Sequence, residues 1–116
     1  MWWKREAMTG ADRKARRLFL RSLSPAQRVE WDKYRRITCI GSASGIKYTI
    51  YPYGRLFGGY PVHNNVRTDR YQFGAHNSRL PDYDVYLIQK LLIETDEKLF
   101  LKRSCRHRYF RRYNWR

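Results

Sequence analysis

The chain has 116 residues and a mass of 14.2 kDa, which suits one compact domain and excludes a multidomain assembly. Hydrophobic residues make up 42% of it and aromatic residues 16%, more than an intrinsically disordered chain carries. Lys and Arg number 25 against 10 Asp and Glu, so the formal net charge of +15 points to a polyanionic partner. Arg supplies 18 of the 25 cations, and its planar guanidinium group is suited to bidentate contacts with phosphate.

The excess charge lies at the two ends of the chain. Residues 1–36 hold 11 basic and 4 acidic side chains, residues 37–101 hold 7 and 6, and residues 102–116 hold 7 and none. We therefore expect a single α+β domain over residues 12–101, a basic aromatic arm over 1–11 and an Arg and aromatic arm over 102–116. Two solvated tails without a partner are the alternative, although small domains usually carry a net charge of only about 2–8 in magnitude.

Processing and compartment signals are sparse. No window approaches about 18 consecutive apolar residues, so no transmembrane segment is expected. The opening MWWKRE carries early charge and is not followed by the apolar stretch of a signal peptide. With only two cysteines, the chain is expected to keep reduced thiols. These features favour the cytoplasm or the interior of a phage or virus particle.

The segment 12–23 predicts a basic amphipathic helix, because apolar residues recur at helical spacing within it. These residues are Ala15, Leu18, Phe19 and Leu23. We expect them to pack against a helix over 82–103, and an anionic membrane surface is the alternative partner. Ser24 to Gln27 matches a capping box with proline at the first helical position and predicts a second helix over 25–36.

From Ile37 the apolar period changes to two, which predicts a β-hairpin over 37–51 with the GSASG sequence as its turn. This turn could present backbone amides to an anion, but it lacks the lysine of a P-loop, and hairpin formation alone explains it. Short strands are expected within 60–73, near residues 60–63, 65–67 and 71–73. Together with the helices, they predict a small antiparallel sheet.

The clearest predicted element is the helix over 82–103, which Pro81 and two early acids introduce. Its expected apolar stripe consists of Val85, Leu87, Ile88, Leu91, Leu92 and Leu99. Its charged residues are expected on an exposed face, with acids balancing lysines. These residues are Lys90, Glu94, Asp96, Glu97 and Lys98. The residues after it, SCRHRYFRRYNWR, are expected to form a tail or a helix extension.

The sequences LSPAQR, IGSASGIKYTI, Asn65-Val66 and LPDYDVYLIQKLLIETDEKLFL together resemble a small uncharacterised domain of bacterial and phage proteins. The resemblance covers about residues 23–101, and LPxxD…QKLLxExDExxFL carries most of it. The chain departs from the pattern after Leu101, where its ending is rich in arginine. The resemblance implies an α+β module in a phage or bacterial setting, and it implies no activity or catalytic residue.

The strongest binding candidates are cations that can hold phosphate and aromatic side chains that can stack on bases. On the first helix they are Arg13, Arg16, Arg17 and Arg21. In the C-terminal segment they are Lys102, Arg103, Arg106, Arg108, Tyr109, Arg111, Arg112, Tyr113, Trp115 and Arg116. Trp2 and Trp3 beside Lys4 and Arg5 repeat the pairing, or fold back onto the domain.

Catalytic and metal motifs are weak. A zinc site could be drawn from Cys39, Cys105, His107 and either His63 or His76, but the spacing of a zinc knuckle is lacking. No nucleophile–base pair stands out, so we expect no enzyme and no cofactor. The leading hypothesis is a nucleic-acid-binding protein, for RNA or DNA, that contacts mostly the backbone within a larger nucleoprotein assembly. The alternatives are a structural subunit of a phage particle or other complex, and a small phage inhibitor that docks on an acidic host protein.

Overall fold

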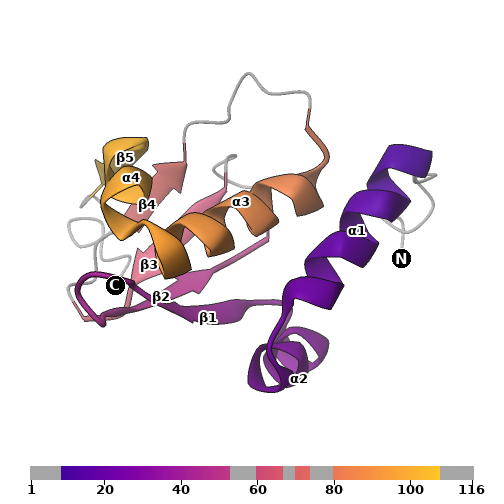
Figure 1. Cartoon of the computed structure of the whole chain (residues 1–116), viewed down its shortest axis with the longest axis horizontal. Helices are drawn as coiled ribbons and strands as arrows, with labels where there is room; N and C mark the ends of the chain where they lie inside the picture. Colours follow the sequence, from indigo (N-terminus) through magenta and orange to yellow (C-terminus); the bar gives the residue numbers. More distant parts are fainter. Residues whose placement is uncertain (1–8, 53–59, 67–69, 74–79, 108–116) are drawn as a thin grey trace, which may run out of the picture.

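The computed structural model of the chain describes residues 9–52, 60–66, 70–73 and 80–107. Over these residues it has the expected α+β fold, with four helices and an antiparallel sheet whose five strands follow the order β1-β2-β3-β4-β5 (Figure 1). The helices are α1 (Gly10–Ser22), α2 (Pro25–Tyr34), α3 (Asp82–Thr95) and α4 (Glu97–Lys102). The strands are β1 (Ile37–Ile40), β2 (Lys47–Ile50), β3 (Pro61–Asn64), β4 (Arg70–Phe73) and β5 (Ser104–His107).

Capping boxes begin both N-terminal helices. The Oγ of Ser24 accepts from the Gln27 N–H (3.1 Å) and the Gln27 Oε1 accepts from the Ser24 N–H (3.0 Å), which confirms the predicted start of α2. α1 begins two residues before the expected position 12, because Thr9 and Asp12 form a second reciprocal pair. α2 ends at Tyr34 rather than at residue 36, since Arg35 adopts a left-handed conformation with φ 56°.

The predicted hairpin is present as β1 and β2. In its register Ile37 lies opposite Ile50 and Cys39 opposite Tyr48, and all four side chains are buried. The reversal ends at Gly45, whose φ of 74° suits a residue without a Cβ atom. The two strands therefore contribute one apolar face to the core.

The outer edge of β1 is covered by α2. Glu30 Oε1 accepts from the Thr38 N–H (2.8 Å), and Gln27 Nε2 donates to the Thr38 carbonyl (2.9 Å). Both polar backbone groups that Thr38 turns away from β2 are thus satisfied by side chains of one helix. Edge strands present such groups to other chains unless they are covered.

The later strands differ in part from the expectation. β3 and β4 lie within the predicted 60–73 range, but Asn65 and Val66 form a turn instead of a strand, with Asn64 Oδ1 accepting from the Val66 N–H (2.9 Å). Residues 104–107 are a strand that pairs with β4, not a tail or a helix extension. The ordered sheet therefore continues past Leu101, where the sequence analysis started the C-terminal arm.

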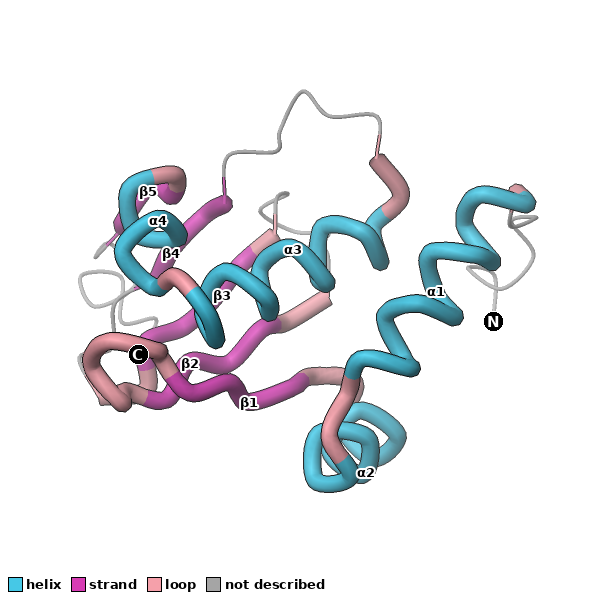
Figure 2. The backbone as a smooth tube through the Cα atoms, in the orientation of Figure 1, coloured by secondary structure: helices cyan, strands magenta, loops and turns pink. Residues whose placement is uncertain are grey.

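The single helix expected over 82–103 is two helices, with the change of direction at Asp96 (Figure 2). Asp96 has φ −152° and ψ 69°, and its Oδ1 accepts from the Leu99 N–H (3.2 Å) as the N-cap of α4. Asp favours such a cap over a helix interior because its carboxylate satisfies a free amide. The apolar periodicity predicted one helix because it runs through Asp96, but Asp96 caps α4 and so separates it from α3.

α3 and α4 lie on one face of the sheet (Figure 1). α3 turns Val85, Tyr86, Gln89 and Ile93 inward, whereas Leu91 of the expected apolar stripe is 45% exposed. The expected packing of α1 on this helix is confirmed, since the Phe19 ring lies 5.8 Å from that of Tyr86, centroid to centroid, although Leu18 of the predicted apolar residues is 44% exposed. None of the helices within the described ranges is long and apolar enough to span a bilayer.

Candidate nucleic-acid interface

α1 presents a row of cations to solvent. Arg13, Arg17 and Arg21 follow one another at intervals of four residues, so they share one side of the helix and rise by about 6 Å per step. Lys14 and Arg16 flank the row, and all five side chains are exposed. These five residues are called the basic face of α1 below. Lys14 was not among the predicted binding residues, although its spacing of three from Arg17 would have placed it there.

Four of the five cations of this face have no salt-bridge partner among the described residues. No salt bridge within the described part of the chain involves Lys14, Arg16, Arg17 or Arg21. The one acid of α1, Asp12, is engaged in the cap with Thr9. Lys14, Arg16, Arg17 and Arg21 are therefore available to an anionic partner.

The opposite side of α1 is anchored in the core. Phe19 is 0% exposed, and its ring lies 5.0 Å from that of Trp31 and 5.7 Å from that of Tyr83, centroid to centroid. These aromatic contacts come from α2 and α3, so two helices fix the orientation of α1. The basic face is consequently held on a packed element rather than on a loop.

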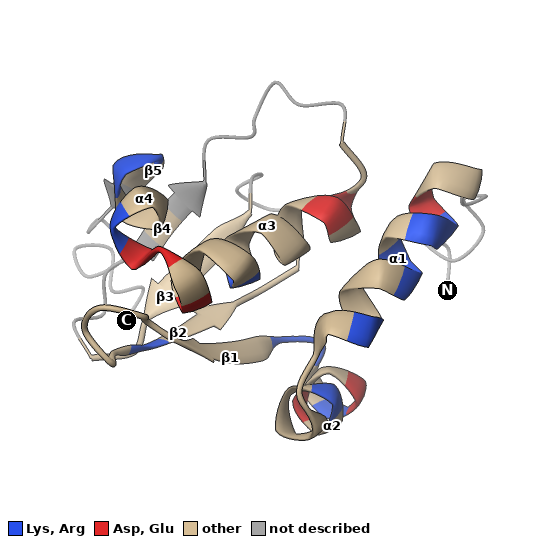
Figure 3. Ribbon diagram, in the orientation of Figure 1, with Lys and Arg blue, Asp and Glu red and all other residues tan. Residues whose placement is uncertain are grey.

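The cations of α2 and of the two residues after it are used differently. Arg28 pairs with Asp32 (3.2 Å) and Arg36 with Glu30 (3.4 Å). The Arg35 guanidinium lies over the Trp31 ring, 5.8 Å from its centroid. α2 therefore neutralises much of its own charge, and the contrast with α1 is visible in the distribution of blue and red in Figure 3.

The structure does not gather the predicted cations into one patch. Lys102 and Arg103 are exposed at the end of α4, which lies at the opposite end of the long axis of the molecule from α1 (Figure 3). Arg106 belongs to β5, where its Cα lies opposite that of Tyr71. The other predicted residues lie outside the described residues, as do Trp2 and Trp3: they are Arg108, Tyr109, Arg111, Arg112, Tyr113, Trp115 and Arg116.

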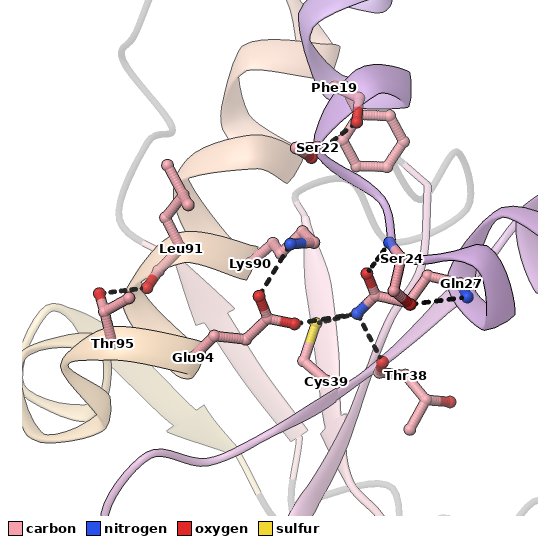
Figure 4. Close-up of polar contacts among 10 residues, drawn as sticks. All are labelled: Phe19, Ser22, Ser24, Gln27, Thr38, Cys39, Lys90, Leu91, Glu94 and Thr95. Carbon is pink, nitrogen blue, oxygen red and sulfur yellow. Dashed lines mark hydrogen bonds and ion pairs between the residues drawn. The ribbon is translucent and has the colours of Figure 1, made fainter.

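A polar network joins α2 to α3 at an open cavity of about 770 Å³ (Figure 4). Glu94 accepts from Lys90 Nζ (2.8 Å) at one carboxylate oxygen and from Gln27 Nε2 (2.9 Å) at the other. Lys90 is 6% exposed and Gln27 8%, so the expectation that Lys90 lies on an exposed helix face is wrong. Lys90 and Glu94 thus pair within α3, and the hydrogen bond from Gln27 to Glu94 connects α3 to α2.

Cys39 lies against this network, with Sγ 3.8 Å from Gln27 Nε2. Burial, together with the nearby Glu94 carboxylate, raises the pKa of its thiol far above the ordinary value, so the sulfur stays protonated. A buried protonated thiol is a poor nucleophile and a poor metal ligand. The arrangement thus supplies no activated cysteine at the cavity.

The β1–β2 turn does hold an anion, and that anion is Glu97 of the same chain. One carboxylate oxygen accepts from the N–H groups of Ala43 (3.0 Å) and Ser44 (2.8 Å). The other accepts from the hydroxyls of Ser44 (2.7 Å) and Tyr48 (2.6 Å). Glu97 is 3% exposed, so its expected place on an exposed helix face is also wrong.

These bonds decide the charge state of Glu97. Burial by itself raises the pKa of the carboxyl, but the hydrogen bonds from Tyr48, Ser44 and Ala43 outweigh it and hold the pKa below the ordinary value of 4.5. Burial and the bond to Glu97 raise the pKa of the Tyr48 hydroxyl, which keeps it a donor. The turn is thereby occupied by an internal carboxylate and is closed to an external anion.

The zinc site drawn from the sequence does not assemble around both cysteines. Cys39 is on β1 and Cys105 on β5, the two outermost strands of the described sheet, which are about 19 Å apart at the usual strand spacing. Two ligands of one ion cannot be this far apart. Among the described residues, no group of three or more His, Cys, Asp or Glu side chains could hold a metal ion.

Comparison of the chain with family models, curated proteins and solved structures finds no match. The resemblance of residues 23–101 to a bacterial and phage domain stays an expectation. The function is therefore argued from the site alone.

Proposed function

We propose that this protein is a non-enzymatic nucleic-acid-binding module that contacts the phosphate backbone through the basic face of α1. The observation that carries the proposal is the row of exposed cations on α1, of which Lys14, Arg16, Arg17 and Arg21 form no salt bridge within the described residues. Guanidinium groups fork onto phosphate oxygens, and their binding releases counterions condensed on the polyanion.

The positions of the cations support this function over a general solubilising charge. Along α1, the positions of Arg13, Arg17 and Arg21 are about 6 Å apart, and the contacts of Phe19 with Trp31 and Tyr83 hold this helix in place. Solvating charges need no such alignment. Lys102 and Arg103, at the far end of the molecule, belong to the proposal as part of a second, C-terminal contact.

The test is a fluorescence-anisotropy titration with labelled nucleic acids at several salt concentrations. A variant with Arg13, Arg16, Arg17 and Arg21 changed to Gln is compared with a matched control in which Arg28, Lys33, Lys47 and Lys98, exposed residues of other elements, are changed to Gln. Both variants lose the same formal charge. We expect the α1 variant to flatten the log–log salt slope by two or more, given about 0.9 per phosphate contact on duplex DNA, and the control to change it little.

An equal loss in both variants would show that only net charge matters and would count against the α1 site. Weak binding by the wild-type protein to every nucleic acid would favour the alternatives, a structural subunit or an inhibitor that docks on an acidic protein. The C-terminal contact is tested separately with Arg106, Arg108, Arg111 and Arg112 changed to Ala. An unchanged salt slope in that variant would remove the C-terminal segment from the interface.

A further inference from the structure

We infer that the ligand of the basic face is double-stranded DNA of B form, with α1 lying in its major groove. This inference rests on the proposed function and narrows it to one class of nucleic acid and one mode of docking. It follows from three properties of α1: its lack of exposed aromatic side chains, its dimensions and its place at the end of the molecule.

The composition of α1 argues against single strands. Proteins that hold single-stranded nucleic acid stack its bases on aromatic side chains beside the cations. Phe19 is the only aromatic residue of α1, and it is 0% exposed beneath Trp31, Tyr83 and Tyr86. The basic face offers charge and hydrogen-bond donors without an aromatic stacking surface, so it fits best a ligand whose bases stay paired.

The dimensions of α1 distinguish between duplexes. A helix with its side chains is about 10–12 Å wide, which matches the major groove of B-DNA at about 12 Å. The major groove of A-form RNA is deep and narrow, and side chains cannot read it. With 13 residues, α1 is about 20 Å long and can follow the groove across several base pairs.

The helix is also placed where a duplex can reach it. α1 lies at one end of the long axis of the molecule, with α3 on its inner side (Figure 1). Apart from Ala15 and Phe19, which are buried, its residues are exposed or half-buried. Arg13, Arg17 and Arg21 are on the side that faces away from Ala15 and Phe19 and would enter the groove first, while Lys14 and Arg16 flank this row and are closer to the groove walls and their phosphates.

Binding to four probes of one sequence tests the inference: duplex DNA, duplex RNA, single-stranded DNA, and duplex DNA whose major groove carries glucosylated 5-hydroxymethylcytosine. We expect duplex DNA to bind at least about tenfold more tightly than duplex RNA or the glucosylated duplex. A tenfold difference in affinity corresponds to the loss of one good contact in the groove. A minor-groove ligand added to the unmodified duplex should leave affinity unchanged. The glucosylation effect should disappear in the variant with Arg13, Arg16, Arg17 and Arg21 changed to Gln.

Equal binding of duplex RNA and duplex DNA, or indifference to glucosylation, would overturn the major-groove inference and leave nucleic-acid binding intact. Sensitivity to the minor-groove ligand would overturn it as well. Failure of all four probes to bind would instead overturn the proposed function itself, so the two failures are distinguishable.

Discussion

A Cβ atom at Gly41 would overlap the carboxylate of Glu97, the first residue of α4. A side chain at position 41 would therefore push the Glu97 carboxylate out of its place in the β1–β2 turn. The same carboxylate accepts hydrogen bonds from Ala43, Ser44 and Tyr48, so the close approach and the bonding depend on each other. This contact joins residues more than 50 positions apart in the sequence.

Gly41→Ala should lower the free energy of unfolding by about 1–3 kcal/mol, the usual cost of overfilling a packed site. Urea denaturation followed by circular dichroism measures the change. Gly10→Ala is the control, because a Cβ there meets nothing within 4 Å, and it should be neutral or slightly stabilising. Equal effects of the two substitutions would contradict the close approach of Gly41 to Glu97.

Glu97→Gln should destabilise the protein by about 1.5–3 kcal/mol at neutral pH, because hydrogen bonds to a charged group are lost. The folded pKa of Glu97 lies below its unfolded value, so its stabilising effect is complete above about pH 4.5 and declines as the pH falls through the folded pKa. The difference between wild type and variant should thus shrink at about pH 3.5. Urea unfolding at both pH values measures it, and a difference independent of pH would refute the charged carboxylate.

Glu94→Ala should cost about 2–3 kcal/mol, since it removes the carboxylate that accepts from the buried ammonium of Lys90 and one of the two oxygens that accept from the Gln27 amide. Adding Lys90→Met to that variant should recover about 1 kcal/mol or more, which a double-mutant cycle from urea unfolding detects. Asp32→Ala is the comparison, because its pair with Arg28 is exposed and should contribute at most about 0.5 kcal/mol. Strict additivity of the Glu94 and Lys90 substitutions would disprove their coupling.

The two thiols should differ in reactivity. In the native protein an alkylating reagent should modify Cys105, which is exposed, and spare Cys39, which is buried and has a raised pKa. Mass spectrometry of the native protein should therefore show one adduct, and the denatured protein two. Cys105→Ser should show none in the native state. Rapid labelling of native Cys39 would mean that the α2–β1–α3 junction opens readily.

Local signals in the sequence were sufficient for several elements. The capping box at Ser24 and the change of period at Ile37 depend on residues a few positions apart, and both were located correctly. The basic side of α1 could also be predicted from the sequence, because helical spacing places Arg17 and Phe19 on different sides of the helix. Such features are determined by backbone preferences within one or two turns.

The remaining features depend on contacts that periodicity does not contain. The helical pattern predicts Lys90 and Glu97 as solvated charges between apolar positions, yet both are buried. Glu97 is bonded by the distant β1–β2 turn, and Lys90 by Glu94 one helical turn away. Strand β5 exists through its pairing with β4, across two intervening helices. Burial of a charge and pairing of a distant strand are tertiary outcomes, and a single sequence carries no local mark of either.

The covering of Thr38 by Gln27 and Glu30 affects how copies of this protein can lie beside one another. Proteins that bind a polyanion through their cations are brought close together along it. Under these conditions, an uncovered strand edge could pair with the edge strand of a neighbouring copy. At Thr38 the backbone N–H and C=O groups are already hydrogen-bonded to α2, so a strand of a second copy cannot pair with them. Neighbouring copies that the proposed function would bring together on a nucleic acid could thus not pair through the backbone groups of Thr38.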